Sequence, residues 1–164
     1  MVISKLSMPE SNNQNFNHLK IHTQYSICEG AIKIDKLKDF CKENKIPCLG
    51  ISDTSNLCGA LEFAENISKV GTQPIIGTQI YFRFEDTTGL LPLIALNEKG
   101  YKKIIELSSR SYLENDALSN PHLDIEELLR DTEGVLLLSG TINGLFGNVM
   151  KRINLIGMWM NFLY

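Results

Sequence analysis

Hydrophobic and polar positions follow two different periods along this chain, which divide it into short strands and amphipathic helices. Strict alternation of apolar and polar positions predicts a first strand at residues 17–23. Short apolar runs predict further strands at residues 48–52, 74–84 (broken at Gly77), 91–96 and 135–138. Apolar residues spaced three and four positions apart predict helices at residues 34–44, 60–70, 101–113 and 125–130.

The helical patterns also predict buried faces and helix starts. The expected buried positions are Ile34, Leu37, Phe40 and Cys41 in the first helix, and Leu61, Ala64, Ile67 and Val70 in the second. Ser26 and Glu29 fit a capping box, and Asp124 is expected to cap the helix at residues 125–130. Each of these expectations rests on local spacing alone.

Strands and helices alternate throughout, which indicates an α/β fold with parallel strands. In a parallel barrel the functional groups lie at the C-terminal ends of the strands. The side chains expected there are His22, Asp53, Gln79 and Ser139. A complete β/α barrel takes about 250 residues, so the 164 residues of this chain predict only part of one.

The chain divides into three parts by composition. Residues 1–15 form a polar N-terminal extension, and residues 16–150 carry the α/β pattern. Residues 151–164 form an atypical apolar end, whose last part reads INLIGMWMNFLY. This end is interpreted either as a core segment or as the product of a truncation or shifted reading frame. It is too short to span a membrane as a helix.

Charge and cysteine content narrow the class of protein. The net charge is −3, whereas a domain that coats nucleic acid is normally basic. The four cysteines form no CxxC pair, which favours reduced thiols in a cytoplasmic protein over a zinc ribbon or a disulfide framework. The glycine-rich nucleotide-binding motifs and the GxSxG motif are absent from the sequence.

Three side chains are weak candidates for a metal site. Phosphoester hydrolysis benefits from two or three divalent metals held by His, Asp and Glu side chains. His22, Asp53 and Glu62 could converge from different strand ends, but three ligands would hold one metal at most. Two of them also have a simpler interpretation: Asp53 can cap its own loop, and the helix dipole favours Glu62 in a first turn. His18 is interpreted as a packed or capping histidine.

Five segments resemble one known family in order and spacing, and they cover roughly residues 16–148. They read FNHLKIHTQYSICEGAIKIDKL, PCLGISDTSNLCGALEF, QPIIGTQIYF, LIALNEKGYKKIIELSSRSYLE and DIEELLRDTEGVLLLSG. On these segments the chain closely resembles the N-terminal PHP (polymerase and histidinol phosphatase) domain of the bacterial replicative DNA polymerase III alpha subunit. The resemblance implies a partial, distorted β/α barrel of the PHP type.

The resemblance also implies that a metal site has been lost. Metal-binding members carry His-x-His in the first strand, where this chain has Lys20 and His22. They usually carry Asp-His-Gly in the second motif, where this chain has Asp53 followed by Thr54. The side chain of Lys20 is expected to take part of the space and charge of a metal.

Of the remaining family positions, one is kept and three are replaced. They are Glu62, which keeps the helix glutamate, Gln79 in place of an acid, Leu90 near an expected histidine, and Thr141 in place of a frequent cysteine. These substitutions imply a vestigial site in which no residue is catalytic and no metal is expected. The magnesium of the full polymerase would belong to another part of the protein.

The function implied is that of a fragment of a DNA-directed DNA polymerase, acting in bacterial chromosomal replication. The fragment itself is expected to be inactive, to stabilise the rest of the alpha chain and to dock the proofreading 3′–5′ exonuclease subunit. DNA would be contacted only through the full holoenzyme, in the cytoplasm, without a membrane.

Two alternatives remain open at this point. One is an active metal-dependent phosphoesterase or 3′–5′ exonuclease on the same scaffold, which the replaced ligand positions disfavour. The other is a small free-standing protein that keeps the fold for an unrelated binding role. That protein would need residues 151–164 to be a true, well-packed end.

Overall fold

A computed structural model describes residues 16–116 and 118–152 of the chain. The predicted polar extension at residues 1–15 lies outside the described residues. So does most of the predicted atypical end, because the description stops at Arg152. The boundary expected at residues 150 and 151 falls inside a helix, α5, which includes residues on both sides of it.

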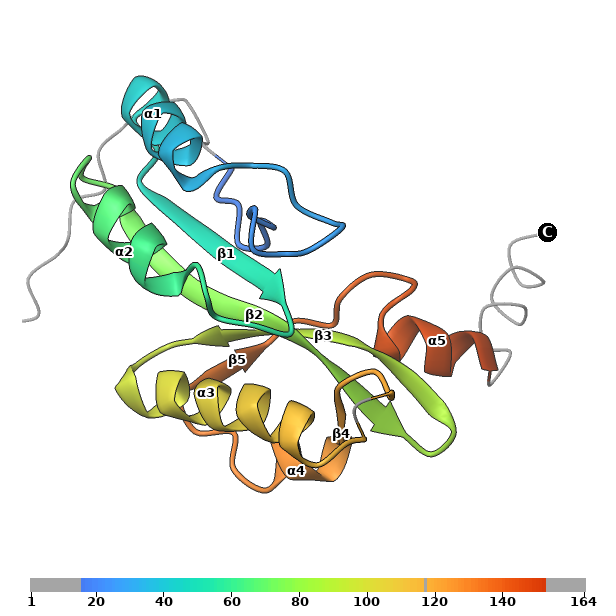
Figure 1. The fold of residues 1–164 in the computed structure, drawn as a ribbon. Coiled ribbons are helices and arrows are strands. Elements are labelled where there is room, and N and C mark those ends of the chain that lie inside the picture. Colours follow the sequence, from blue (N-terminus) through green and yellow to red (C-terminus); the bar gives the residue numbers. More distant parts are fainter. Residues whose placement is uncertain (1–15, 117, 153–164) are drawn as a thin grey trace, which may run out of the picture.

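Helices and strands follow one another through the described residues (Figure 1). Their order is α1 (Ile34–Asn44), β1 (Cys48–Thr54), α2 (Ala60–Ser68), β2 (Gln73–Phe84), β3 (Thr87–Ala95), α3 (Glu98–Leu113), β4 (His122–Asp124), α4 (Ile125–Leu129), β5 (Val135–Leu137) and α5 (Leu145–Arg152). The α/β class predicted from the sequence is confirmed, and α1 has the predicted bounds.

The sheet is mixed rather than parallel throughout. Its strand order is β1-β2-β3-β5, and β4 pairs with β2. The pairs β1–β2 and β2–β4 are parallel, whereas β2–β3 and β3–β5 are antiparallel. The prediction of parallel strands alternating with helices is therefore wrong for both pairings of β3.

A tight turn explains why β3 runs against β2. Only Glu85 and Asp86 separate the two strands, and Glu85 has a φ of 51°. So short a connection can join antiparallel neighbours but not parallel ones. The register pairs Phe84 with Thr87 next to this turn. The apolar pattern predicted the inner part of β3 but not its first residues, which are polar.

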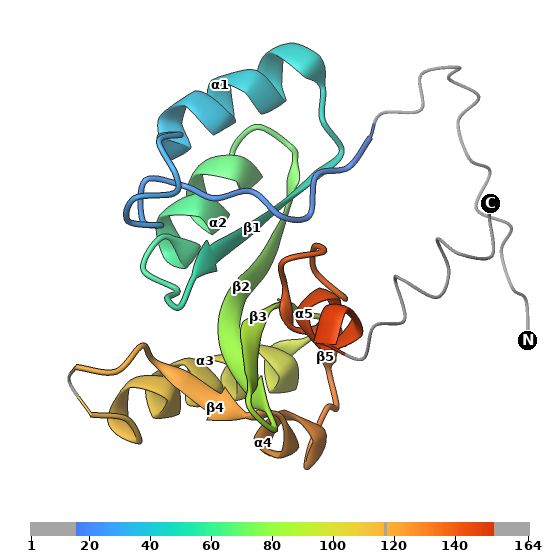
Figure 2. The ribbon, with the colours of Figure 1, turned by 90° about the vertical axis from the view of Figure 1, so that its right-hand side faces the viewer.

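Strand β2 is continuous and links the two halves of the molecule. It runs between an upper group of α1, α2 and β1 and a lower group of α3, α4, β4 and β5 (Figures 1 and 2). The break predicted at Gly77 does not occur. A Cβ atom at Gly77 would lie 2.5 Å from the carbonyl oxygen of Leu93 on β3. Glycine thus permits close strand packing here and does not end the strand.

Two hydrophobic cores stabilise these halves. The upper core joins α1 and α2 to β1, through side chains that include Ile34, Phe63 and Ile51. The lower core joins α3 and α4 to β2 and β3. Leu57, in the loop between β1 and α2, packs against both cores. The loop after β1 is thereby fixed where the two halves meet.

The buried face predicted for the second helix is partly wrong. Leu61 is 72% exposed, whereas Ile67 is buried as predicted and the other buried side chains of α2 are Ala60 and Phe63. The sequence offers two apolar stripes on this helix. The approach of α1 and β1 decides which stripe is covered. A 3.6-residue period cannot settle that choice by itself.

An extended segment precedes α1 and lies along the free edge of β1. The Gly50 amide donates to the His18 carbonyl at 2.7 Å, and the Ser52 amide donates to the Ile21 carbonyl at 2.8 Å. The predicted strand at residues 17–23 is observed as this bonded segment, with isolated bridges at Ile21 and Thr23 rather than a regular strand. It brings Thr23, Ser26 and Glu29 to Asp53 and Thr54, at the C-terminal end of β1.

Candidate functional site

Asp53 is the centre of the polar cluster at the C-terminal end of β1. Its carboxylate is buried, with 1% of the residue exposed. The Thr23 amide donates to Oδ1 at 2.6 Å, the Thr23 hydroxyl donates to Oδ2 at 2.7 Å, and the Ser26 hydroxyl donates to Oδ1 at 2.7 Å. Hydrogen bonds to an ionised acceptor are among the strong ones in proteins. The carboxylate thus has three internal donors from the extended segment and its loop.

Ser26 does not begin a helix, contrary to the capping-box prediction. Helix α1 starts at Ile34 and has Lys33 at its N-cap position. The Ser26 hydroxyl donates to Asp53 and accepts from the Thr54 amide at 3.1 Å. Its partners are 27 and 28 residues away in sequence. Local spacing therefore identified a polar pair but assigned it the wrong structure.

A second series of hydrogen bonds, next to Asp53, joins the side chains of Glu29, Thr54 and Gln79. The Thr54 hydroxyl donates to the Glu29 carboxylate, and the Gln79 amide donates to the Thr54 hydroxyl at 2.6 Å. Thr54 and Gln79 are among the predicted family positions, whereas Glu29 is not. The signal that could have found Glu29 is a carboxylate beside Gly30, in the loop that follows His22.

Glu62 lies in the first turn of α2 and faces the same loop. The Tyr25 hydroxyl donates to its Oε2 at 2.6 Å. This hydrogen bond raises the pKa of Tyr25, because losing the proton would leave two negative oxygens in contact. Gly59, just before α2, leaves room for the Tyr25 ring: a Cβ atom there would lie 2.7 Å from the ring.

His22 is half-buried and lies beside Glu29. Its Nδ1 is 3.5 Å from the Ser26 hydroxyl and 4.0 Å from the Glu29 Oε2. Lys20 is half-buried on the same extended segment. Its expected role as a substitute for a metal remains a prediction. His18 is exposed and packs edge-on against the Phe16 ring, which agrees with the interpretation as a packed histidine.

The other predicted positions lie apart from this cluster or contribute little to it. Leu90 lies on β3 opposite Tyr81 of β2, where its side chain offers no ligand atom. Thr141 is exposed, and its hydroxyl accepts from the Asn143 amide at 3.3 Å. Ser139 is exposed in the loop after β5.

Two of the three weak metal candidates, Asp53 and Glu62, accept hydrogen bonds from protein side chains. Across residues 16–116 and 118–152, no group of three or more His, Cys, Asp or Glu side chains is arranged to hold a metal ion. Asp53 is bonded to Thr23 and Ser26, and Glu62 is bonded to Tyr25. Donors from Thr23, Tyr25 and Ser26 thus reach three of the four carboxylate oxygens of Asp53 and Glu62.

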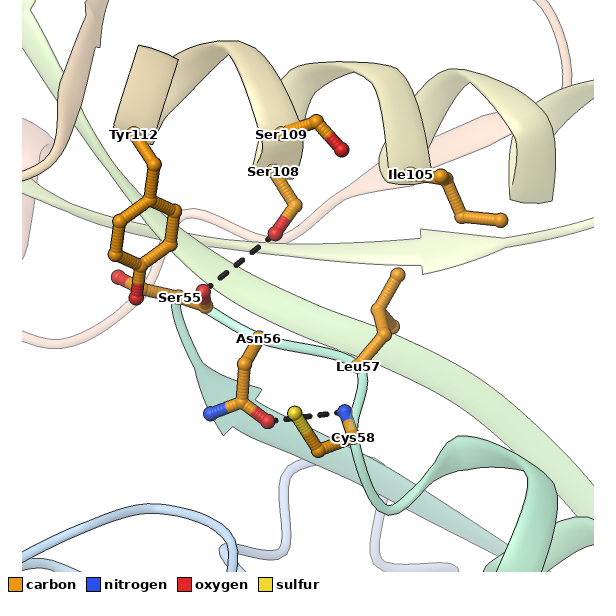
Figure 3. A pocket seen from close by; sticks show the side chains of 8 residues that line it. All are labelled: Ser55, Asn56, Leu57, Cys58, Ile105, Ser108, Ser109 and Tyr112. Atoms are coloured by element: carbon orange, nitrogen blue, oxygen red, sulfur yellow. Dashed lines mark hydrogen bonds between the residues drawn. The ribbon is translucent and has the colours of Figure 1, made fainter.

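A separate hollow lies where the two halves meet, between the loop after β1 and helix α3 (Figure 3). It has a volume of about 490 Å³ and is lined by Leu57 and Cys58 from the loop and by Ile105 and Tyr112 from the helix, among others. The Ser108 hydroxyl contacts the Ser55 carbonyl at 3.5 Å across it. None of the predicted ligand positions lines this hollow.

Comparison with known families gives one match over most of the chain. The profile of the PHP domain matches residues 18–159. That range includes every predicted ligand position and extends seven residues beyond Arg152, the last residue that the structure describes.

Two relatives of this chain are both named DNA polymerase III subunit alpha. The DNA polymerase III subunit alpha of Caulobacter vibrioides is 37% identical over 146 residues, which cover 84% of this chain and 13% of that protein. The subunit alpha of Aquifex aeolicus is 35% identical over 147 residues, covering 80% of this chain and 13% of that protein. The chain therefore spans about an eighth of the length of these relatives.

Solved structures give a weaker likeness. A protein of Bifidobacterium adolescentis described as a metal-dependent phosphoesterase has 17% identity and a TM-score of 0.47, over 59% of this chain and 33% of that one. An amidohydrolase of Chromobacterium violaceum has 16% identity and a TM-score of 0.45, over 60% of this chain and 34% of that one.

None of the helices in the described part of the chain is long and apolar enough to cross a membrane.

Proposed function

The chain belongs to the PHP domain family, and from this premise we propose that it serves as a non-catalytic PHP domain of a DNA polymerase III subunit alpha. Its role would be to stabilise the polymerase chain and to dock the proofreading 3′–5′ exonuclease subunit during chromosomal replication. The shared name of the relatives supports the polymerase assignment. The polymerase activity would then belong to parts of a longer protein that this chain does not include.

The hydrogen bonding of Asp53 is the observation that carries the non-catalytic proposal. A carboxylate that binds a metal must direct an oxygen lone pair at the ion. Both Asp53 oxygens instead accept from Thr23 and Ser26 at 2.6–2.7 Å. These three hydrogen bonds take three of the roughly four lone-pair positions of the carboxylate, so about one position, on Oδ2, is left for an ion.

The neighbouring positions fit a metal cluster poorly. Thr54 and Gln79 offer a neutral hydroxyl and a neutral amide, which bind hard divalent cations more weakly than carboxylates do. Lys20 carries a positive charge that repels a cation. We therefore propose that this domain holds no metal cluster, and that the magnesium of the full polymerase is bound elsewhere in that protein.

The proposed partners follow from the same assignment. They are the rest of the alpha chain, the exonuclease subunit and, through the assembled holoenzyme alone, DNA. The net charge of −3 supports an indirect relation to DNA, because direct coating of the phosphate backbone requires positive charge. A cytoplasmic location would follow from a role in replication.

Metal content is the first test of the proposal. The purified chain would be equilibrated with zinc, manganese or magnesium, desalted and analysed by elemental mass spectrometry. The comparison is a variant with Lys20→His, Thr54→His and Gln79→Glu. We expect the wild type to retain no stoichiometric metal. Retention of two or three metals per chain, together with hydrolysis of DNA or of a phosphomonoester, would establish the active phosphoesterase or exonuclease instead.

Partner binding tests the docking role independently. The chain would be immobilised and probed with a purified proofreading exonuclease subunit, with Glu29→Gln as a control that changes the polar cluster without truncating a side chain. We expect binding to both forms. Absence of binding by a folded chain would leave the structural role but rule out docking through residues 16–152.

A further inference from the structure

The lower core opens to the surface in an apolar groove between α4, α5 and the end of β2. The groove has a volume of about 240 Å³, several times the roughly 30 Å³ share of a water molecule. Its floor includes Ile125 and Leu145, which are 8% and 2% exposed and belong to the lower core. The groove is therefore continuous with that core.

The rim of the groove is apolar and exposed. Phe84 at the end of β2 is 40% exposed, Leu129 of α4 is 62% exposed and Phe146 of α5 is 43% exposed. All the side chains that line the groove are hydrophobic. A contiguous patch of this kind, opening into a core, is typical of a surface that another apolar segment covers.

The chain leaves α5 next to this groove. Arg152, the last described residue, donates to the Asp86 carboxylate at 3.0 Å from its Nη2 and to the Thr87 hydroxyl at 3.4 Å from its Nη1. Asp86 lies in the turn that directly follows Phe84 and Glu85. These bonds fix the end of α5 against the turn beside the rim.

The sequence that continues from Arg152 is apolar and is matched by the family profile. Residues 153–159 read INLIGMW, in which only Asn154 and Gly157 are not large and hydrophobic. The PHP profile extends through residue 159. Seven residues can reach roughly 25 Å from their starting point, enough to cover the groove.

We propose that the apolar side chains of residues 153–159 dock in the groove and close the lower core. The occupant is thus a segment of the same chain, selected by its apolar sequence and by the place where α5 delivers it. This inference is independent of the polymerase assignment, because it concerns how the domain covers its own core.

The single tryptophan of the chain, Trp159, provides a direct test. Its emission maximum and its quenching by acrylamide would be measured in the full chain, in buffer and in urea. We expect a blue-shifted, protected indole in buffer and a red-shifted, accessible one in urea. An indole as accessible in buffer as in urea would overturn the proposal.

A pair of variants localises the protection. Leu129→Lys places a charge on the rim of the groove at a residue exposed enough to accept it, and we expect it to shift the emission to the red and to increase quenching. Leu113→Lys is the matched control, because Leu113 is 82% exposed on α3 and does not line the groove. Far-ultraviolet circular dichroism would establish that both variants are folded.

Two results would refute the intramolecular docking. Protection of Trp159 that survives Leu129→Lys would place the indole in a different site. Protection that disappears on dilution, together with a concentration-dependent mass in sedimentation, would make a second copy of the chain the occupant.

Discussion

Removal of the Ser26 hydroxyl tests whether the polar cluster holds the extended segment against β1. Ser26 is fully buried, donates to Asp53 at 2.7 Å and accepts from the Thr54 amide at 3.1 Å. The variant Ser26→Ala deletes both hydrogen bonds with the loss of one oxygen atom. The Asp53 carboxylate keeps the two donors from Thr23.

Two contributions make up the expected loss of stability. A hydrogen bond to a charged group contributes about 1.5–3 kcal/mol, and a fully buried amide left without an acceptor costs about 1–3 kcal/mol, an upper range for the half-buried Thr54. The two are coupled through one atom, so they do not simply add. We expect Ser26→Ala to lower the free energy of unfolding by about 2–4 kcal/mol, a large part of the total for a domain of this size.

Urea unfolding followed by circular dichroism at pH 7 provides the measurement. A loss of this size shifts the midpoint by on the order of 1–2 M at a slope of about 2 kcal/mol/M. Ser109→Ala is the matched control, since Ser109 is exposed on α3 and its loss should change stability by less than about 0.5 kcal/mol. Equal midpoints for the two variants would refute the idea that this network anchors the segment.

Three further outcomes are expected. Cys41 should be alkylated far more slowly than Cys28 in the native chain, and peptide mass spectrometry would measure both rates. Cys41 is buried and burial raises the pKa of its thiol, whereas Cys28 is exposed. Asn97→Ala should lower the free energy of unfolding in urea by about 1 kcal/mol, because the Asn97 side chain caps α3; an unchanged midpoint would contradict this. Arg83 lowers the pKa of Asp124, so their contact stabilises the fold above the unfolded-state pKa of about 3.9 and is lost as the pH falls through the folded-state pKa. Asp124→Asn should therefore cause a small loss in thermal midpoint at pH 7 and none in strong acid; a loss independent of pH would contradict the assignment.

The candidate site was only partly predictable, because its bonds connect distant parts of the chain. Family positions pointed to Thr54, Gln79 and Glu62, and all three take part in hydrogen bonds at the end of β1 or the start of α2. Glu29 was missed, and Ser26 was assigned to a helix that does not start there. Their partners lie 25–28 residues away, so no local spacing could reveal them.

The sequence by itself determined the α/β class and the position of most helices. Helix α1 has the predicted bounds, since an amphipathic stripe and the punctuation around it are local properties. The capping of α3 by Asn97 is also a local feature, because the Asn97 side chain bonds an amide only three residues away. Elements of this kind depend on neighbours in sequence.

Only the tertiary structure decided how these elements meet. The direction of β3, the exposure of Leu61 and the covering of the edge of β1 by an extended segment all depend on packing between distant residues. The same is true of Asp53, whose buried carboxylate accepts hydrogen bonds from Thr23 and Ser26, 30 and 27 residues away in sequence. A pattern along the chain fixes which faces are apolar or polar, but the partners of those faces are fixed by the approach of segments far apart in sequence.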